Sequence, residues 1–598
     1  MSKKGYEKIK IGNREAVKGL GSFPLRPVGD LKKLVCGAAE RYGEKTAFKY
    51  KVKDKIITKS YIDFCSDINA LGTAMLKLGL KGASVAVIGE NRYEWGVAYL
   101  SIINGVGRGV PLDKHLPVNE IENLIDRSGA KAIFFSKSYV KEMKALAEKN
   151  KTLKYFLCFD ELSKEELCEG FFSMEKLVNE GKKLIDEGDN SFLDIVIDVN
   201  EPCILLFTSG TTSTSKGVML CHKNIAANVT SATGFIDLKD DDCALSVLPL
   251  HHTFENTLGM MFMVHSGVCV AYCQGIKYIA KNLKEFEVSV MIGVPAIFEA
   301  MARQIEDGVK KSGQGKKVNM LKKISGFLNK IGIDVRRPML APVRNKLAPS
   351  MRVMASGAAP IDKSVIMLYE SLGIQFLQGY GLTETSPLVA ATMPGKNIYG
   401  SVGHPVAGVS VAIDNPDENG MGELLVKGDN VMLGYYENEE ATEEAFTEDG
   451  WFRTGDLAKF EEHDAVVITG RAKSMIVFTN GKKAFPEEYE FLLNKIEGVK
   501  DSFAWGCEAP DGDVEMCAKI VTEEPTEEFI ASVEREIKKI NTEMPRYKML
   551  RYFIVSREPV TRNTTLKIKR PVEQKKIEAY LSDNDLTMRK AHKSIVSI

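Results

Sequence analysis

Short apolar runs and amphipathic stretches alternate along most of the chain before about residue 400. Five runs of five or six residues predict buried strands: Ala83–Ile88, Ala130–Phe135, Lys154–Phe159, Ala244–Leu248 and Val288–Ile292. Apolar positions at helical spacing in Asn119–Arg127 and Tyr139–Lys149 predict helices between them. This alternation predicts α/β layers with mainly parallel sheets.

The pattern changes near Gly400 to short strands separated by turns. Val409–Ile413 and Glu423–Lys427 flank the turn sequence 415–420, which predicts a β subdomain of short strands. After residue 470, 128 residues remain with strands and helices of their own. We therefore predict a large domain over 1–470 and a small α+β domain over 471–598, since 598 residues exceed a single core.

Composition narrows the classes of protein. Apolar residues make up 44% and charged residues 27%, which is typical of a soluble globular protein. Eighty basic residues balance eighty acidic ones, so we expect no nucleic-acid partner. The eleven cysteines lack metal-ligand spacing and predict reduced thiols in the cytoplasm. The apolar segment Leu258–Cys273 is short for a membrane span and predicts buried core.

A loop rich in hydroxyl groups follows the apolar run Leu205–Phe207. It contains seven Ser or Thr residues, Gly210 and Lys216, and leads into Gly217. Hydroxyls, backbone N–H groups and one lysine suit the polyphosphate of a nucleotide. A Walker-type loop needs Ser or Thr directly after the lysine, which Gly217 excludes. A solvated linker remains the alternative from composition alone.

Later motifs offer further chemistry for a nucleotide. In Gln378–Thr385, Tyr380 offers a flat ring for a base, Thr383 a hydroxyl for phosphate and Glu384 a carboxylate for Mg²⁺. Asp456 follows Gly450–Gly455 and can accept hydrogen bonds from two hydroxyls. The other candidate motifs, each weak by itself, are Ser356–Pro360, Gly470–Lys473 and Thr561–Arg570.

These motifs, in this order, resemble the adenylate-forming (AMP-binding) superfamily, and most closely its bacterial long-chain fatty acyl-CoA synthetases. The similarity extends over about Leu31–Lys575. The chain departs from the usual pattern at three places, with Ser213 for Gly, Ser215 for Pro and Leu566 for Gly.

The resemblance implies a role for each candidate residue. It assigns the nucleotide to Thr208, Ser209, Gly210, Thr211, Thr212, Lys216, Gly357, Ala358, Ala359, Gln378, Gly379, Tyr380, Gly381, Thr383, Asp456 and Arg471. It assigns Mg²⁺ to Glu384 and Thr208, catalysis to Lys567, Lys216, Glu384 and His252, and a hinge to Lys473 in a mobile small domain. Lys569 competes with Lys567 for the role of adenylation lysine. Zinc at His251 and His252 is disfavoured because no third ligand stands nearby.

The implied reaction joins a carboxylic acid to a thiol at the expense of ATP. The acid, here a long-chain fatty acid, forms an acyl-AMP, and coenzyme A then takes the acyl group and releases AMP. Medium-chain or aryl acids, or a carrier protein as acceptor, share this chemistry. A nucleotide-binding protein without catalysis is an alternative from another class.

One segment stands apart from these motifs. Residues 303–346 carry twelve Lys or Arg against three acidic residues. Apolar residues recur there at helical spacing: Met320, Leu321, Ile324, Phe327, Leu328 and Ile331. This pattern suits either a helix on the inner face of a membrane or a packed helix with a solvated basic side. The sequence leaves both open.

Overall fold

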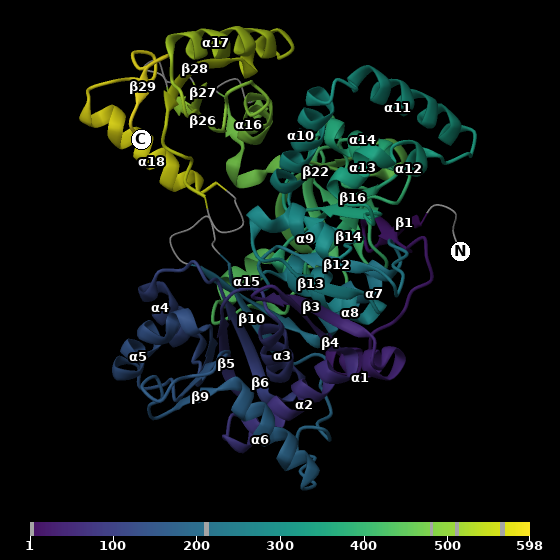
Figure 1. Cartoon of the computed structure of the whole chain (residues 1–598). Helices are drawn as coiled ribbons and strands as arrows, with labels where there is room; N and C mark the ends of the chain where they lie inside the picture. The colour runs from purple at the N-terminus through teal and green to yellow at the C-terminus, as the bar shows by residue number, and fades with distance from the viewer. Residues whose placement is uncertain (1–4, 209–214, 479–481, 509–513, 563–567) are drawn as a thin grey trace.

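The computed structural model describes residues 5–208, 215–478, 482–508, 514–562 and 568–598. Two large, mainly parallel sheets dominate the first four hundred of them (Figure 1). The first has the order β21-β11-β10-β6-β5-β7-β8-β9. Its strands are β5 (Ala83–Ile88), β6 (Gly107–Leu112), β7 (Ala132–Phe135), β8 (Tyr155–Cys158), β9 (Phe171–Ser173), β10 (Pro202–Thr208), β11 (Lys216–Cys221) and β21 (Gly434–Tyr435).

The second large sheet has nine strands in the order β18-β17-β16-β15-β14-β12-β13-β3-β4. Those from β16 to β3 run parallel. The strands are β3 (Thr46–Val52), β4 (Lys55–Ser60), β12 (Cys243–Ser246), β13 (Cys269–Tyr272), β14 (Val290–Gly293), β15 (Val353–Ser356), β16 (Gln375–Gly381), β17 (Leu388–Ala391) and β18 (His404–Pro405). All five strands predicted from apolar runs are present, and their ends differ from the predicted ones by at most two residues.

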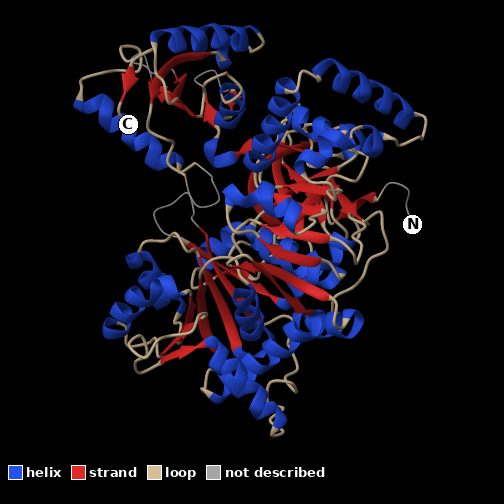
Figure 2. Cartoon of the chain, in the orientation of Figure 1, coloured by secondary structure: helices blue, strands red, loops and turns tan. Residues whose placement is uncertain are grey.

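Helices cover both sheets (Figure 2). One hydrophobic core joins residues of both sheets to helices α2, α3, α7 and α8, so these helices connect the two layers. The helices before residue 303 are α1 (Leu31–Tyr42), α2 (Tyr61–Lys77), α3 (Tyr93–Ser101), α4 (Val118–Ser128), α5 (Val140–Lys149), α6 (Met174–Asp186), α7 (His222–Thr233), α8 (Phe262–Ser266), α9 (Ile279–Glu285) and α10 (Pro295–Lys311). The segment Leu258–Cys273 is buried core, as predicted, except that Cys273 at its end is half-buried.

Sequence signals explain how individual helices begin. Ser60 and Asp63 form a reciprocal capping box at the start of α2, in which each side chain accepts from the other's backbone N–H. Asp30 accepts from the backbone N of Lys33 at the start of α1. Both caps satisfy N–H groups that the first helical turn leaves without partners.

A third sheet is antiparallel and has the order β1-β2-β19-β20-β22-β23. Four strands come from the region predicted as short strands: β19 (Ser410–Asp414), β20 (Gly422–Lys427), β22 (Phe452–Phe460) and β23 (Val466–Arg471). The other two, β1 (Tyr6–Ile11) and β2 (Arg14–Gly19), come from the beginning of the chain. The short helix α15 (Glu439–Ala445) lies between β21 and β22 in the sequence.

The last part of the chain builds two small sheets and two cores of its own. It contains β24 (Ile476–Val477), β25 (Lys483–Ala484), α16 (Pro486–Leu493), β26 (Asp501–Glu508), β27 (Val514–Val521), α17 (Glu527–Thr542), β28 (Leu550–Ser556), α18 (Arg570–Asp583) and β29 (Ile595–Val596). Lys495 forms an ion pair with Asp362, at the start of α14 (Lys363–Ser371) in the larger part. The mixed α/β fold is confirmed; the domain boundary at 470/471 stays a prediction.

Candidate active site

A hairpin of two antiparallel strands holds the ends of the hydroxyl-rich loop. Thr208 at the end of β10 is paired with Lys216 at the start of β11, and its Oγ1 donates to the Lys216 carbonyl at 3.3 Å. The apolar run therefore leads into the loop as a strand. The other predicted loop residues, Ser209, Gly210, Thr211 and Thr212, lie outside the described residues.

Lys216 and Glu384 are linked through an aromatic side chain. The Lys216 ammonium lies 4.6 Å from the centre of the Tyr435 ring, and the Tyr435 hydroxyl donates to Glu384 Oε1 at 3.0 Å. Burial, with the charge of Glu384 adding to it, raises the pKa of Tyr435, so the phenol stays protonated and donates. Tyr435 thus holds a cation and a carboxylate close together on its two sides.

Arg127, on α4, fixes the far end of the loop. Its guanidinium donates to Ser215 Oγ at 3.0 Å and to the Ser215 carbonyl at 2.8 Å, and it lies 4.9 Å from the Phe207 ring centre. Sequence analysis did not find Arg127 or Tyr435, because nothing in their local sequence marks these contacts.

The turn that carries Glu384 is held by two buried asparagines. Asn228 and Asn430 both donate to the Thr385 carbonyl, at 3.0 and 3.1 Å. Asn228 Oδ1 also accepts from the Leu388 backbone at 2.7 Å. At Gly381 a side chain would place its Cβ 1.8 Å from the Pro387 carbonyl oxygen, so this position requires glycine.

Tyr380, Asp456 and Arg471 form the second cluster of predicted residues. The Tyr380 hydroxyl donates to one Asp456 oxygen at 2.6 Å, and Arg471 Nε lies 3.0 Å from the other. Asp456 and Arg471 face each other on β22 and β23. Burial and the Asp456 charge raise the pKa of Tyr380 well above its ordinary value. Each carboxylate oxygen has a second lone pair with which to accept a hydroxyl.

The small-residue segment Gly357–Ala359 lies at the end of β15. Ser356 is paired with Gly293 on one side and Gln378 on the other, which places this segment beside the Tyr380 strand. A Cβ at Gly357 would lie 2.9 Å from the Phe254 ring. The segment therefore also contacts the stretch that contains His252.

His252 lies against its neighbour His251, with ring centres 3.9 Å apart. Burial, and then the neighbouring His252, lower the pKa of His251 well below its ordinary value, which keeps this ring neutral. Among the described residues no three His, Cys, Asp or Glu side chains converge into a metal-binding group. A Mg²⁺ ion held by Glu384 and substrate phosphates fits that finding, because magnesium is commonly bound by one or two carboxylates.

The last motif contains two candidate adenylation lysines, Lys567 and Lys569. Lys567 lies outside the described residues. Lys569 is exposed directly before α18, and its backbone N donates to the Thr561 carbonyl at 2.8 Å. Arg570 fixes this end of α18 through two hydrogen bonds to Glu490, at 2.9 and 2.7 Å.

A buried ion pair supports the same motif. Lys519 and Glu573 are fully buried and lie 2.6 Å apart. The second Glu573 oxygen accepts from the Thr561 backbone at 2.9 Å, and Lys519 also donates to the Ile598 carbonyl at 2.6 Å. Both ends of the motif are therefore tied to the core of the last part of the chain.

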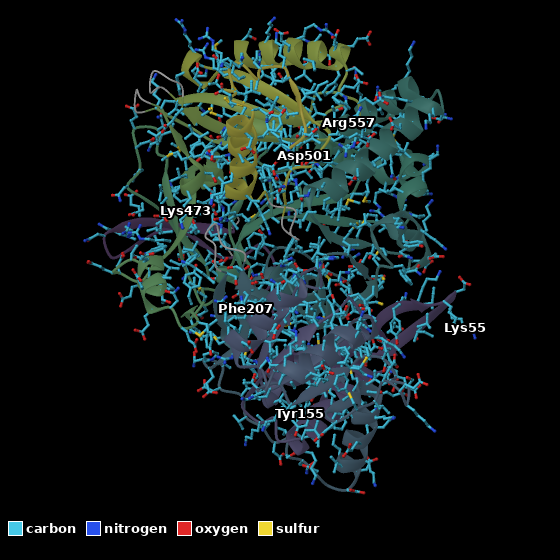
Figure 3. The ribbon with its side chains drawn as sticks, turned by 90° about the vertical axis from the view of Figure 1, so that its left-hand side faces the viewer. Lys55, Tyr155, Phe207, Lys473, Asp501 and Arg557 are labelled. Atoms are coloured by element: carbon cyan, nitrogen blue, oxygen red, sulfur yellow. The ribbon has the colours of Figure 1, made fainter. Side chains whose placement is uncertain are left out.

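Lys473, the predicted hinge, is exposed in a 3₁₀ turn (Ala472–Ser474) directly after β23. Figure 3 shows it at a height between Asp501 and Arg557 above and Phe207 and Tyr155 below. The position suits a pivot between the two parts of the chain.

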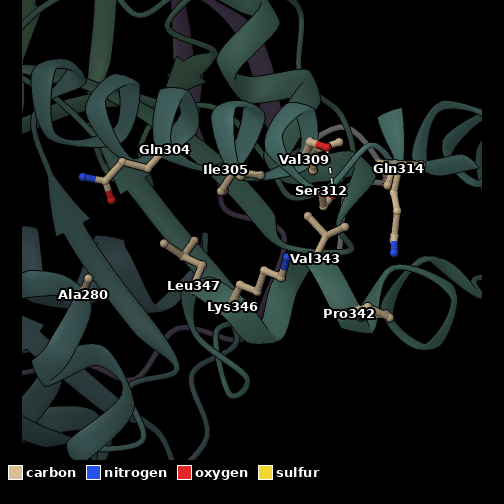
Figure 4. Close-up of a pocket in the computed structure, with 12 residues that line it drawn as sticks. Ala280, Gln304, Ile305, Val309, Ser312, Gln314, Pro342, Val343, Lys346 and Leu347 are labelled. Carbon is tan, nitrogen blue, oxygen red and sulfur yellow. Dashed lines mark hydrogen bonds between the residues drawn. The ribbon is translucent and has the colours of Figure 1, made fainter. Parts of the chain in front are cut away.

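A pocket of about 310 Å³ lies elsewhere, between α10, α11 (Gly315–Lys330) and α13 (Ala341–Leu347) (Figure 4). Its walls are mainly apolar, with Ile305, Val309 and Leu347 among them and Lys346 as a charged member. It contains none of the predicted site residues, so it belongs to the basic segment and not to the nucleotide site.

The fold and these clusters define an adenylate-forming enzyme, and the comparisons with known proteins agree. A family model described as AMP-binding enzyme matches residues 37–436. The chain therefore belongs to the AMP-binding enzyme family.

Curated relatives are similar over most of their length. The long-chain-fatty-acid–CoA ligase FadD15 of Mycobacterium bovis is 28% identical over 445 residues, 72% of each chain. A chloroplastic long-chain-fatty-acid–[acyl-carrier-protein] ligase of Arabidopsis thaliana, AEE15, is 25% identical over 76% of this chain and 71% of its own.

Solved structures confirm the fold. The anthranilate CoA ligase AuaEII in complex with anthranoyl-AMP matches with a TM-score of 0.73 at 17% identity, covering 94% of this chain and 99% of its own. ATP-bound MatB from Rhodopseudomonas palustris also gives 0.73, at 22% identity, over 92% and 99%.

Proposed function

We propose that the chain is an ATP-dependent acid–thiol ligase that activates a long-chain fatty acid and transfers it to coenzyme A. The observation that carries the proposal is the pair of clusters: Lys216 and Glu384 meet around Tyr435, and Tyr380 and Arg471 contact Asp456. The relatives named as long-chain fatty acid ligases support the choice of acid.

The chemistry follows from the charges that must be neutralised. A carboxylate is a poor electrophile, and its attack on the α-phosphorus of ATP converts it into a mixed anhydride with pyrophosphate as leaving group. Lys216 would neutralise charge on the β- and γ-phosphates. Glu384 would hold Mg²⁺, which supplies further neutralisation when bound. Asp456 would accept the ribose hydroxyls, with Tyr380 and Arg471 fixing its orientation.

Lys567 would bridge the α-phosphate and the substrate carboxylate. Its motif is anchored through Thr561 to the buried pair Lys519–Glu573. The second half-reaction needs room for the thiol, and rotation of the last part of the chain about Lys473 would provide it.

The test is acid-dependent ATP–pyrophosphate exchange over fatty acids of graded length, with benzoates and amino acids alongside. We expect exchange to peak at long chains. A Lys567→Ala variant should lose it by about a hundredfold or more, the usual scale for a charge-stabilising group, while a Lys569→Ala variant retains it. If none of the acids supports exchange, the assignment is overturned and a nucleotide-binding protein without catalysis is favoured.

The acceptor has a second candidate, a phosphopantetheine-bearing carrier protein, because a relative is named as an acyl-carrier-protein ligase. Competition between coenzyme A and loaded carrier protein distinguishes the two. We infer a cytoplasmic setting, since all eleven cysteines are free thiols. Across the described residues, no helix combines the length and apolar character that crossing a bilayer requires.

A further inference from the structure

Helix α11 (Gly315–Lys330) has two apolar faces instead of one. Its inner face includes Val318, which is 5% exposed, and half-buried Leu321 and Leu328. This face packs toward α10 and α14, and Val318 lines the pocket of Figure 4 together with residues of α10 and α13. The basic segment is therefore in part a packed helix, which was one of the two interpretations of its sequence.

The second apolar face points into solvent. Met320, Ile324, Phe327 and Ile331, here called the outer stripe, are 54%, 43%, 65% and 58% exposed. Their spacing of four, three and four residues keeps them within about 60° of one another around the helix. An exposed apolar row of this length is unusual on a soluble surface and marks an interaction site.

Charge surrounds the outer stripe. Between Asp307 and Asp334 the chain has seven lysines and no acidic residue. Lys316, Lys323 and Lys330 fall on one side of the stripe and Lys317 on the other, by the same helical spacing. In the described part of the chain, none of the seven has a carboxylate within ion-pair distance. Six of the seven are exposed, all but half-buried Lys322, and their charge is available to an anionic partner.

The helix is also accessible. Figure 1 shows α11 at the edge of the chain, projecting away from the sheets that carry the nucleotide site. A flat surface can approach it without meeting the catalytic clusters. An apolar row flanked by lysines fits the boundary between headgroups and acyl chains of an anionic bilayer, where apolar side chains enter and lysines contact the headgroups.

We propose that α11 is a peripheral membrane anchor, with the outer stripe inserted among the lipids and its lysines paired with anionic headgroups. The proposal is independent of which acid the enzyme activates. Membrane binding requires both the outer stripe and the lysines beside it. Apolar insertion alone does not distinguish anionic from neutral lipids, and salt screens the attraction of lysines to headgroups.

Cosedimentation of the full chain with vesicles tests it, without nucleotide or acid. We expect wild-type protein to bind phosphatidylglycerol vesicles about tenfold more strongly than phosphatidylcholine vesicles, and less as salt increases. The variant Ile324→Ser/Phe327→Ser should lose most of this binding. The charge variant Lys316→Gln/Lys317→Gln/Lys323→Gln should bind both vesicles equally weakly.

The matched control is Val196→Ser, which removes another exposed apolar residue, 92% exposed and distant in sequence. It should bind like wild type. Because the substituted side chains are exposed, circular dichroism and thermal unfolding of all variants should match. Equal binding by wild type and the stripe variant would overturn the proposal. Self-association of wild-type protein that the stripe variant abolishes, without vesicle binding, would assign the stripe to a second copy of the chain.

Discussion

Glu255 shows how far a single residue can depart from its ordinary chemistry. It is 1% exposed on the turn of helix (Phe254–Met261) that follows His252. Burial raises the pKa of its carboxyl to about 8, against the smaller opposing effects of Ser246 and the Leu248 backbone. At pH 7 the folded chain therefore holds this group protonated.

We expect the stability of the wild type to fall as pH rises. Between the ordinary value near 4.5 and the folded value near 8, the unfolded chain releases this proton while the folded chain keeps it. Relative to a Glu255→Gln variant, the free energy of unfolding of the wild type should fall by roughly a few kcal/mol between pH 4.5 and 8. Urea unfolding of both proteins at several pH values measures this. If the free energies of unfolding of the two proteins change in parallel with pH, the prediction is contradicted. Glu418→Gln is the control, because Glu418 is exposed.

The residues that sequence analysis found and missed differ in how they act. Tyr380, Asp456 and Lys216 stand in motifs whose composition already indicates nucleotide chemistry. Arg127 and Tyr435 act through contacts with partners 88 and 51 positions away. Such pairings depend on which strands and helices become neighbours, and local sequence carries no signal of that.

At the scale of elements, α18 depends on one buried ion pair. Removing one partner leaves a charge buried without compensation, which costs roughly 3–5 kcal/mol. We expect Lys519→Met to destabilise the last part of the chain by that amount, and Lys519→Met/Glu573→Leu to recover part of it. Denaturant unfolding of the single and double variants measures the coupling; additive losses would show that the pair acts as two independent groups.

The same pair predicts sensitivity to acid. Burial opposes ionisation of Glu573, but hydrogen bonds from Lys519 and Thr561 prevail and lower its pKa. Its contribution to stability is therefore present above the ordinary carboxyl value and is lost as pH falls through the lowered folded value. The protection of the Thr561 amide, which donates to Glu573, should fall in that range and in Glu573→Gln at neutral pH, where protection is the exchange rate relative to the intrinsic rate at the same pH. Unchanged protection would contradict the prediction.

Element prediction succeeded where periodicity was strong. The five apolar runs are strands, and Asn119–Arg127 and Tyr139–Lys149 are helical. The sequence did not predict that β1 and β2 join the antiparallel sheet beside β19. A sheet edge built from segments far apart in the sequence has no local signature. For the basic segment, periodicity predicted a helix but not its two apolar faces, since only the packing of Val318 and Leu321 shows which face is covered.

At the scale of the whole molecule, two parts of the chain are joined through the turn at Lys473. The ion pair between Lys495 and Asp362 connects them in this arrangement. Each part has hydrophobic cores of its own, so one can move against the other without exposing a shared core. The domain boundary at 470/471 stays a prediction from the order of motifs, and the sequence carries no signal of the contact between Lys495 and Asp362.

If the small part rotates about Lys473, restricting that backbone position should separate the two half-reactions. Proline fixes φ near −65°, within the range of a 3₁₀ turn, so Lys473→Pro fits the turn seen here and resists a change of φ. We expect it to impair one half-reaction by about tenfold or more and to spare the other. Lys473→Ala removes the same side chain but leaves φ free, and should affect both half-reactions little.

Pyrophosphate exchange measures the first half-reaction, and thioester formation from preformed acyl-AMP measures the second. Full rates in both would exclude Lys473 as the hinge, and equal losses in both variants would assign the effect to its ammonium group.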